Sequence, residues 1–272
     1  MPELPEVEVV RRELSELTKN QPRIERLVFT RKDLRDPMPI KKLQTFVGAE
    51  ILAIHRRAKY LLIETSKGGI LSHLGMTGTW RVAAVGEEMG HDHIYLSLSN
   101  GLRLAFRDPR RFGIFETYDR ENPNRSPRLK SLGVEPLSSD FSAEYLGSKL
   151  RGKKAPIKAT LMDQKLVVGI GNIYASEALF LAGIRPQRRA DRLTKAEVQL
   201  LAEKIKSLLQ TAIQGGGSSI SDFKGASGGE GSYQDSHQVY DRKGEKCVIC
   251  GTTIRSSVMA GRSTFWCSHC QK

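Results

Sequence analysis

The sequence lacks a hydrophobic segment long enough to cross a membrane, and it lacks the opening pattern of an export signal. Its longest apolar run extends only from Ala178 to Ile184, whereas a membrane-spanning helix needs about 18 residues or more. An export signal would combine a basic start with an apolar stretch of about 7–15 residues. The first eight residues instead contain two prolines and three glutamates. We therefore expect a protein that is neither exported nor inserted in a membrane.

Cysteine is scarce, and all four cysteines lie within the last 26 residues. Such confinement is not typical of a disulfide framework and fits a reducing cytoplasm. Two CxxC pairs separated by sixteen residues have the spacing of a zinc ribbon, whose four thiolates form a closed tetrahedral site. The predicted ligands of one structural Zn²⁺ are Cys247, Cys250, Cys267 and Cys270.

The zinc-ribbon segment is too short to have much core of its own, so we expect the metal to supply its folding energy. Between the two pairs, Ala260-Gly261-Arg262 predicts a hairpin tip that presents Arg262 outward. His269 breaks the CxxC spacing and is interpreted as a bystander. A zinc ribbon alone does not distinguish an enzyme from a binding module.

Acidic residues are fewer than basic ones. The 43 lysines and arginines against 30 acidic residues give a net charge of +13. An excess of this size favours a polyanion, above all nucleic acid, as the partner. A basic protein without a nucleic-acid role remains the alternative.

The GxGxxG dinucleotide fingerprint is absent. The segment 168–172, Val-Gly-Ile-Gly-Asn, joins two predicted helices at 157–165 and 173–181. Its glycines permit a tight turn with backbone N–H groups free for a phosphate. Basic residues without an acidic neighbour precede it: Lys149, Arg151, Lys153, Lys154 and Lys158. Such a run is ordinarily a solvated face, but beside this turn phosphate contact explains it better.

The length of 272 residues suggests two domains. A helix is predicted from Leu4 to about Thr18. Short strands follow over 23–118, with Asn100-Gly101 between alternating segments as a hairpin signal. Helical periodicity returns after Ser142, and Thr194 to Glu197 form a capping box.

The predicted fold class is α+β: an N-terminal helix on an antiparallel β-sandwich, then a helical domain with a C-terminal zinc-ribbon hairpin. The predicted boundaries are 1–118 for the N-terminal β-sandwich domain, 119–136 for a linker, 137–236 for the helical domain and 237–272 for the zinc ribbon. The glycine-rich segment 215–231 contains seven glycines. It is interpreted either as a flexible linker or as a loop that closes over a ligand.

The start of the chain allows two interpretations. Removal of Met1 would leave Pro2 with a secondary amine that can attack a sugar carbonyl and form a cationic iminium. Glu3 and Glu6 lie close enough in sequence to transfer protons. Alternatively, Pro5 and the acidic residues suit an ordinary first helical turn. On spacing alone the capped helix is favoured.

Several motifs together resemble the bacterial formamidopyrimidine-DNA glycosylase family from end to end. They are Pro2-Glu3-Leu4-Pro5-Glu6-Val7-Glu8, Arg57-Ala58-Lys59-Tyr60, His73-Leu74-Gly75-Met76-Thr77-Gly78, His91-Asp92-His93, Asp108-Pro109-Arg110-Arg111-Phe112-Gly113, Gly169-Ile170-Gly171-Asn172-Ile173-Tyr174 and the cysteine array with Ala260-Gly261-Arg262. The related endonuclease VIII group usually has glycine at the fourth position, where this chain has Leu4.

The resemblance implies a helix-two-turn-helix arrangement for residues 137–236 and a mechanism at the N-terminus. Pro2 is expected to attack C1′ as the lesion base leaves, with Glu3 transferring protons and Glu6 ordering the terminus. Lys59 is expected near the scissile phosphate. Arg262 is expected to grip phosphate during δ-elimination.

The resemblance also implies how DNA is held. A base inside a duplex must be flipped out to be reached, and the vacancy must be filled by a wedge; the wedge side chains are expected to be Met76, Arg110 and Phe112. Expected backbone contacts are His91, Asn172, Arg151, Lys153, Lys154 and Lys158. The glycine-rich segment is expected to cover the everted base, with Ser218 contacting it through its main chain. The family usually carries a basic residue where this chain has Ser221.

The function implied is base-excision repair by a bifunctional DNA glycosylase and abasic-site lyase. It would remove 8-oxoguanine and formamidopyrimidines from damaged double-stranded DNA, then cleave the strand by β,δ-elimination. We expect a monomer that acts in the bacterial cytoplasm at the nucleoid. The alternatives are an endonuclease VIII-like enzyme for oxidised pyrimidines and a non-catalytic zinc-ribbon DNA-binding protein.

Overall fold

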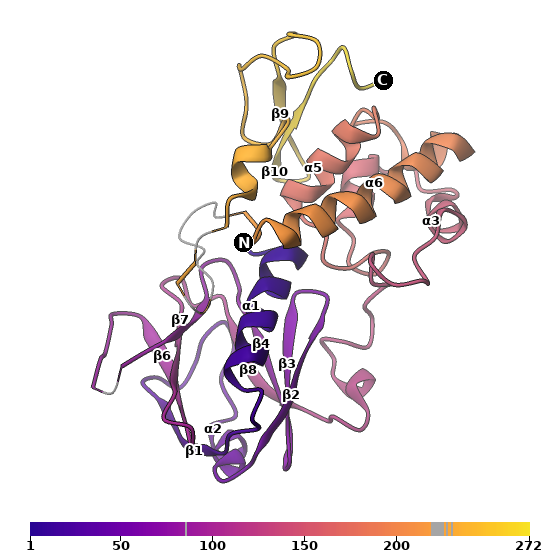
Figure 1. Cartoon of the computed structure of the whole chain (residues 1–272). Coiled ribbons are helices and arrows are strands. Elements are labelled where there is room, and N and C mark those ends of the chain that lie inside the picture. The colour runs from indigo at the N-terminus through magenta and orange to yellow at the C-terminus, as the bar shows by residue number, and fades with distance from the viewer. Residues whose placement is uncertain (85, 219–225, 227, 230) are drawn as a thin grey trace. The chain divides into compact units, whose positions relative to one another are not determined.

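The computed structural model describes residues 1–84, 86–218, 226, 228–229 and 231–272. They form two compact units (Figure 1). The first contains residues 1–131 together with 215–232, and the second contains 132–214 together with 233–272, each in its described residues. The glycine-rich segment, predicted to belong to the helical domain, is thus grouped with the first unit. Ser221 lies outside the described residues.

The first unit is an antiparallel β-sandwich with one long helix, α1 (Leu4–Leu17). Within the described residues its strands form two four-stranded sheets, ordered β1-β6-β7-β5 and β2-β3-β4-β8, and every pairing is antiparallel. The strands are β1 (Ile24–Phe29), β2 (Ile51–Arg57), β3 (Tyr60–Thr65), β4 (Gly68–His73), β5 (Thr79–Val82), β6 (Asp92–Leu98), β7 (Arg103–Arg107) and β8 (Ile114–Tyr118); short turns of helix are α2 (Ile40–Leu43), η1 (Gln44–Phe46) and η2 (Pro123–Arg125). The predicted sandwich is confirmed.

Helix α1, drawn in indigo in Figure 1, forms where the sequence predicts it. A proline stands in its first turn, and Glu3 and Glu6 complete a capping box that serves the otherwise unpaired N–H groups there. Val7, Val10 and Leu14 lie on one face and are buried in the core that the two sheets share. This packing fixes the start of the helix, and therefore Pro2 and the glutamates, relative to the sandwich.

The Asn100-Gly101 hairpin forms between β6 and β7, with Leu96 opposite Leu104 and Gly101 at φ +82°. The predicted strand region 51–65 is a hairpin as well, because the chain turns at Ala58-Lys59 between β2 and β3. Ala58 adopts a φ of +55°, which is uncommon for a residue other than glycine. This turn carries Lys59.

The second unit contains helices and a C-terminal hairpin. Its elements are α3 (Ala143–Leu150), α4 (Ile157–Leu161), α5 (Asn172–Leu181), η3 (Ala190–Arg192), α6 (Lys195–Gln214), η4 (Tyr233–Ser236), β9 (Arg255–Met259) and β10 (Arg262–Trp266). The predicted capping box is present: the Thr194 N–H donates to Glu197 Oε2 (2.7 Å), and the Glu197 N–H donates to Thr194 Oγ1 (3.3 Å). Helix α4 ends at Leu161, four residues before the predicted end at Lys165, because the chain turns at Asp163, whose carbonyl accepts from the Leu166 N–H.

Within the described residues, no helix combines the length and the apolar character that crossing a bilayer requires.

Candidate functional site

A buried acidic cluster surrounds the start of α1. Pro2 is buried, and Glu3 and Glu6 are each 2% exposed. One carboxylate oxygen of Glu6 accepts a hydrogen bond from the Glu3 backbone N–H at 2.8 Å. Carboxylates removed from water in this way require hydrogen-bond donors, so their positions are tightly specified.

The second carboxylate oxygen of Glu6 accepts from the backbone N–H of Ser218, also at 2.8 Å. The neighbouring Gly217 has a φ of +76°, and a Cβ there would lie 3.0 Å from the same Glu6 oxygen. Glycine therefore allows the chain to approach the carboxylate closely. Glu6 thus joins the first turn of α1 to residues 217–218, and the Ser218 N–H that the resemblance assigns to the lesion base donates to Glu6 here.

The surroundings of the chain start favour an uncharged amine. Burial lowers the pKa of the Met1 amino group below its ordinary value, while the nearby Glu3 and Glu6 carboxylates act to raise it. The positive charges of Lys59 and Arg110 lower it further. These four side chains therefore lie near the amino group, and the net effect is a larger share of the nucleophilic, deprotonated form at neutral pH.

Lys59 is buried in the turn between β2 and β3. The turn is tied to α1 by Arg56, which donates from Nε to Glu8 Oε2 (3.0 Å) and from Nη1 to the Ala58 carbonyl (3.0 Å). Burial acts to raise the pKa of Glu8, but its hydrogen bonds and ion pairs with Arg11 and Arg56 bring the pKa below its usual value. Glu8 therefore stays ionised and holds the helix and the turn together.

His73, at the end of β4, is a residue to which the sequence alone assigned no role. Burial, helped by the positive charge of Lys59, lowers the His73 pKa to about 4. Its Nδ1 accepts a hydrogen bond from the Gly75 N–H (3.0 Å), as a neutral imidazole can. Its position at the head of the His73-Leu74-Gly75 motif was the available signal.

The three predicted wedge residues lie on loops of the first unit. Met76 is 38% exposed and Phe112 is 41% exposed, unusually high for large apolar side chains, and Arg110 is also exposed. The Arg110 guanidinium lies over the Phe112 ring, 4.9 Å from its centroid. His91, exposed and at φ +72°, immediately precedes β6. All four residues therefore lie outside the strands, in the described part of the first unit, whereas insertion into DNA stays a prediction.

The basic run of the second unit divides into two kinds of residue. Arg151, Lys153 and Lys154 are exposed, whereas Lys158 is 2% exposed. The Lys158 ammonium donates to Asn172 Oδ1 (2.6 Å), the Ser263 carbonyl (3.0 Å) and Thr264 Oγ1 (2.9 Å).

Asn172, in the first turn of α5, itself donates from Nδ2 to the Ser263 carbonyl at 3.0 Å. Lys158 and Asn172 together therefore connect the starts of α4 and α5 to strand β10. Arg262 is exposed at the first position of β10, opposite Met259, and follows a turn in which Ala260 and Gly261 have positive φ. The predicted hairpin tip is confirmed.

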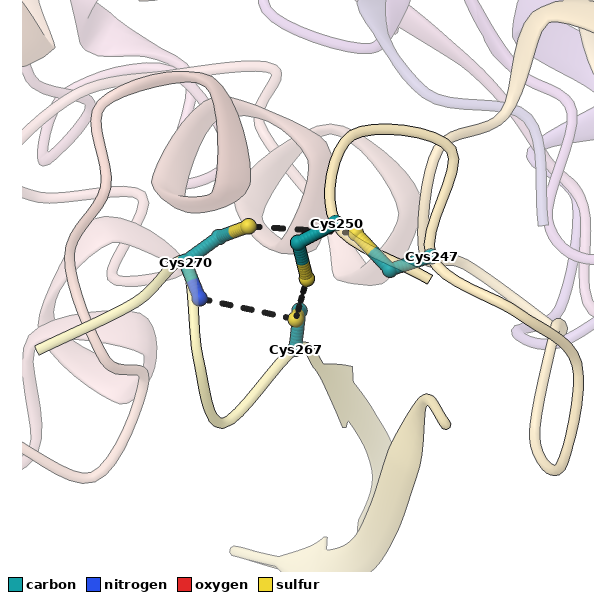
Figure 2. Close-up of side chains that lie close together, drawn as sticks. All are labelled: Cys247, Cys250, Cys267 and Cys270. Atoms are coloured by element: carbon teal, nitrogen blue, oxygen red, sulfur yellow. Dashed lines mark hydrogen bonds between the residues drawn. The ribbon is translucent and has the colours of Figure 1, made fainter. Parts of the chain in front are cut away.

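The four cysteines converge on one point (Figure 2). Their sulfur atoms all lie within 4.8 Å of one another, with Cys247–Cys270 at 3.8 Å and Cys250–Cys267 at 3.5 Å. Tetrahedral Zn²⁺ with Zn–S bonds of about 2.3 Å places its sulfurs about 3.8 Å apart. The donor set therefore fits one structural zinc ion, as the sequence predicts, and His269 is exposed.

Glu177, in the middle of α5, is a fully buried carboxylate that sequence reasoning missed. It accepts from the backbone N–H groups of Gln238, Val239 and Tyr240 at 2.8, 2.9 and 2.8 Å. Burial raises the Glu177 pKa, and the three N–H donors oppose that shift. An acidic residue inside the apolar segment 173–181 was the signal for it.

Comparison with protein families identifies all three parts of the chain. The formamidopyrimidine-DNA glycosylase N-terminal domain matches residues 1–115, and the formamidopyrimidine-DNA glycosylase H2TH domain matches residues 132–224. A zinc finger found in FPG and IleRS matches residues 244–272.

Curated relatives match over the whole length. The formamidopyrimidine-DNA glycosylase of Bdellovibrio bacteriovorus is 57% identical over 272 residues, covering 100% of both chains. That of Stenotrophomonas maltophilia is 42% identical over 273 residues, also covering 100% of both.

Solved structures of FPG proteins are also similar to this chain. The MutM (FPG) protein from Thermus thermophilus has a TM-score of 0.90 and 39% identity, covering 99% of this chain and 98% of that one. The Lactococcus lactis FPG (MutM), solved with a FAPY-dG containing DNA, has a TM-score of 0.90 and 36% identity, covering 99% and 100%.

Proposed function

The chain belongs to the formamidopyrimidine-DNA glycosylase family, and from that premise we propose that it is a base-excision repair enzyme that removes oxidised purines from duplex DNA and then cleaves the abasic strand. Relatives in the family have been solved with Fapy-dG DNA and with DNA that contains an abasic site. The observation that carries the proposal for this chain is the position of Pro2, which is buried just before α1 beside the buried carboxylates of Glu3 and Glu6, with the charge of the buried Lys59 acting on the chain start.

Removal of Met1 turns Pro2 into the nucleophile. Its nitrogen lone pair forms a bond to C1′, the glycosidic bond breaks, and the base leaves with its electron pair and takes up a proton. The bound nitrogen then loses its N–H proton, and its lone pair opens the sugar ring by breaking the C1′–O4′ bond, with O4′ taking up a proton. The resulting iminium withdraws electrons, so a proton is lost from C2′ and the 3′ phosphate leaves in β-elimination. Burial lowers the pKa of the Met1 amino group, one residue before Pro2, and the same surroundings would favour the uncharged form of a Pro2 amine.

The neighbouring side chains divide the remaining work. Glu3 transfers protons during base loss, and Glu6 orders the terminus through its bond to the Glu3 N–H. Lys59 offsets the charge of the scissile phosphate. Arg262, exposed on the zinc-ribbon hairpin, grips phosphate during δ-elimination.

DNA is held by exposed side chains of both units. Met76, Arg110 and Phe112 fill the space left by the everted base. His91, Asn172 and the exposed members of the basic run contact phosphates, and the net charge of +13 strengthens such contacts. We take the enzyme to act as a monomer on chromosomal DNA in the bacterial cytoplasm, where this substrate is found.

Borohydride trapping tests the proposal. Incubation with an 8-oxoguanine:C duplex and borohydride should yield a covalent protein–DNA adduct whose linkage maps to Pro2. Pro2→Gly should lower the yield and the cleavage rate, whereas Pro5→Ala, three residues further along, should retain both. A Pro2→Gly variant that traps and cuts at the wild-type rate would rule the mechanism out, as would an active enzyme whose intact mass retains Met1.

The substrate class needs its own comparison. Cleavage of 8-oxoguanine:C should be faster than cleavage of thymine-glycol:A under identical conditions. The reverse order would assign the chain an endonuclease VIII-like preference for oxidised pyrimidines. Tight lesion binding without any product would indicate a binding module.

A further inference from the structure

Two loops of the first unit carry the exposed wedge residues. Residues 74–78 connect β4 to β5 and contain Met76, and residues 108–113 connect β7 to β8 and contain Arg110 and Phe112. A wedge works only if its side chains are already in place when the duplex opens, because ordering them at that moment costs conformational entropy. The contacts that hold the two loops together are therefore part of the function.

One carboxylate joins the two loops. Asp108 is 0% exposed. Its Oδ1 accepts from the Thr77 hydroxyl at 2.7 Å, and its Oδ2 accepts from the Gly113 backbone N–H at 2.7 Å. Thr77 follows Met76 and Gly113 follows Phe112, so each bond holds the residue next to a wedge side chain.

Further contacts close the network. The Thr77 oxygen accepts from the Arg110 backbone N–H at 3.2 Å, so the same hydroxyl serves both loops. Gly75, at φ +67°, lies against the backbone of Phe112, and a Cβ there would be 2.4 Å from the Phe112 carbonyl carbon. The two backbones are therefore in direct contact.

The backbone of Asp108 extends the network to a predicted phosphate contact. Its N–H donates to the His91 carbonyl (2.9 Å), and its own carbonyl lies 2.9 Å from His93 Nε2. Burying a carboxylate costs free energy unless hydrogen-bond donors satisfy it. Any other arrangement of these loops would remove a donor from Asp108 and would therefore be disfavoured. Asp108 thus specifies one arrangement of four exposed side chains without reaching the surface itself.

We propose that Asp108 is a positioning residue for lesion eversion, whose carboxylate fixes Met76, Arg110 and Phe112 as one preformed wedge. This inference rests on the proposed glycosylase function, because it concerns the step that opens the duplex. It assigns Asp108 no part in bond breaking. Its loss should therefore slow reactions that need eversion and spare those that do not.

A matched pair of variants tests the inference. Thr77→Val removes the hydroxyl while keeping the shape of the side chain, and Thr77→Ser keeps the hydroxyl. Single-turnover excision from an 8-oxoguanine:C duplex should fall about tenfold in Thr77→Val, the rate equivalent of about 1.4 kcal/mol lost in the transition state. It should stay within about twofold of wild type in Thr77→Ser, whose hydroxyl retains both bonds. Asp108→Asn should behave as Thr77→Val does.

The second substrate is a preformed abasic site in single-stranded DNA, which needs no eversion. Cleavage there should fall much less than excision from the duplex does in all three variants. A 2-aminopurine placed opposite the lesion supplies a spectroscopic readout, because entry of the wedge unstacks it. The fluorescence rise on binding should be smaller in Thr77→Val than in Thr77→Ser. Thr77→Val carries the test if Asp108→Asn does not fold, because it leaves the buried carboxylate and its bond to Gly113 in place.

Two outcomes overturn the inference. One is an equal loss on both substrates in Thr77→Val, which would indicate a general structural defect. The other is excision and fluorescence that match wild type in Thr77→Val or in folded Asp108→Asn. Failure of the proposed function is distinct, because the wild-type enzyme would then release no 8-oxoguanine at all.

Discussion

At the scale of single residues, the site depends on buried acceptors that each serve two parts of the backbone. Glu6 accepts from the Glu3 N–H and from the Ser218 N–H, one through each oxygen. An ionised carboxylate suits two donors, because it has acceptor positions only. The first turn of α1 and residues 217–218 therefore depend on one side chain.

Glu6→Gln should distinguish the role of Glu6 as a double hydrogen-bond acceptor from a role in packing, because the two side chains have nearly the same shape. The variant keeps one acceptor oxygen, but its amide NH₂ faces a backbone N–H and cannot accept from it. One of the two charge-assisted hydrogen bonds of Glu6 is therefore lost, and a bond of this kind contributes about 1.5–3 kcal/mol. We expect single-turnover excision of 8-oxoguanine to fall by about ten- to a hundredfold. Glu16→Gln, exposed on the same helix, is the matched control and should be unaffected. An unchanged excision rate in Glu6→Gln would contradict the role.

Glu6 also shows how far the sequence could predict the site. Its capping role follows from its distance of three residues from Glu3. Its partner Ser218 lies 212 residues away, and no local pattern encodes such a contact. Lys158 was interpreted within its basic run as a phosphate contact, because its partners at Ser263 and Thr264 are over a hundred residues distant. Asp108 bonds to Gly113 in its own loop and to Thr77 in another loop, and the motif that contains Asp108 does not indicate that second contact.

At the scale of elements, Lys158 joins three of them. It lies in α4 and bonds to Asn172 in α5 and to the backbone and side chain of β10. Because its ammonium is buried, we expect Lys158 to contribute more to the unfolding free energy than to DNA affinity. We expect the exposed Lys154 to contribute to DNA affinity and little to the unfolding free energy.

Lys158→Met tests this assignment, with Lys154→Met as its control. Methionine keeps an unbranched chain but leaves buried acceptors short of a donor, so we expect a loss of about 1–3 kcal/mol in unfolding free energy, measured in urea. Lys154→Met should leave stability unchanged and reduce the slope of log binding constant against log salt by about one phosphate contact. The assignment is wrong if Lys158→Met shows the salt effect and no loss of stability.

Zinc removal should unfold the β9–β10 hairpin region without unfolding the sandwich. The apolar residues of the ribbon, Val239, Ile254 and Phe265, form only a small cluster, which is completed by Phe180 of α5, so the metal contributes much of the ribbon's folding energy. Chelation should abolish strand cleavage, and added Zn²⁺ should restore it. Cys250→Ser should lose bound zinc, measured by metal analysis, whereas His269→Ala should retain one equivalent. Full cleavage by the zinc-free protein would contradict this dependence.

The hairpins also differ in how well the local sequence predicts their turns. The β6–β7 hairpin is marked by Asn100-Gly101, which tolerate the backbone angles of a tight turn. The β2–β3 hairpin turns at Ala58-Lys59, neither of which is a typical turn residue, and strand-forming residues such as Ile54 and Ile63 lie on both sides of the turn. Sheet pairing, rather than turn preference, determines that bend, so the sequence predicts strand character over 51–65 but not the reversal within it.

At the scale of the whole molecule, each unit contains a histidine whose pKa is lowered to about 4. Burial lowers the pKa of His73 to about 4, reinforced by Lys59, Arg35 and Arg128. Burial likewise lowers the pKa of His237 to about 4, although Asp241 and Asp235 oppose the shift. In the unfolded chain both imidazoles regain an ordinary pKa near 6.5.

The sign of the effect follows from proton binding. Between pH 6.5 and 4 the unfolded chain binds protons that the folded chain does not, so stability falls as the pH is lowered through this range. The stability is fully present above pH 6.5. Each histidine steepens the fall by at most about 1.4 kcal/mol per pH unit.

Urea unfolding at pH 7.5, 5.5 and 4.5 measures this dependence. His73→Gln and His237→Gln should each flatten the fall of the unfolding midpoint below pH 6.5, and the double variant should be flatter than either. Because the two histidines belong to different units, their effects should add. If the double variant loses stability between pH 6.5 and 4.5 as steeply as wild type does, protonation of these two side chains does not cause the acid sensitivity. Other groups must then cause it, among them His93, whose pKa burial also lowers.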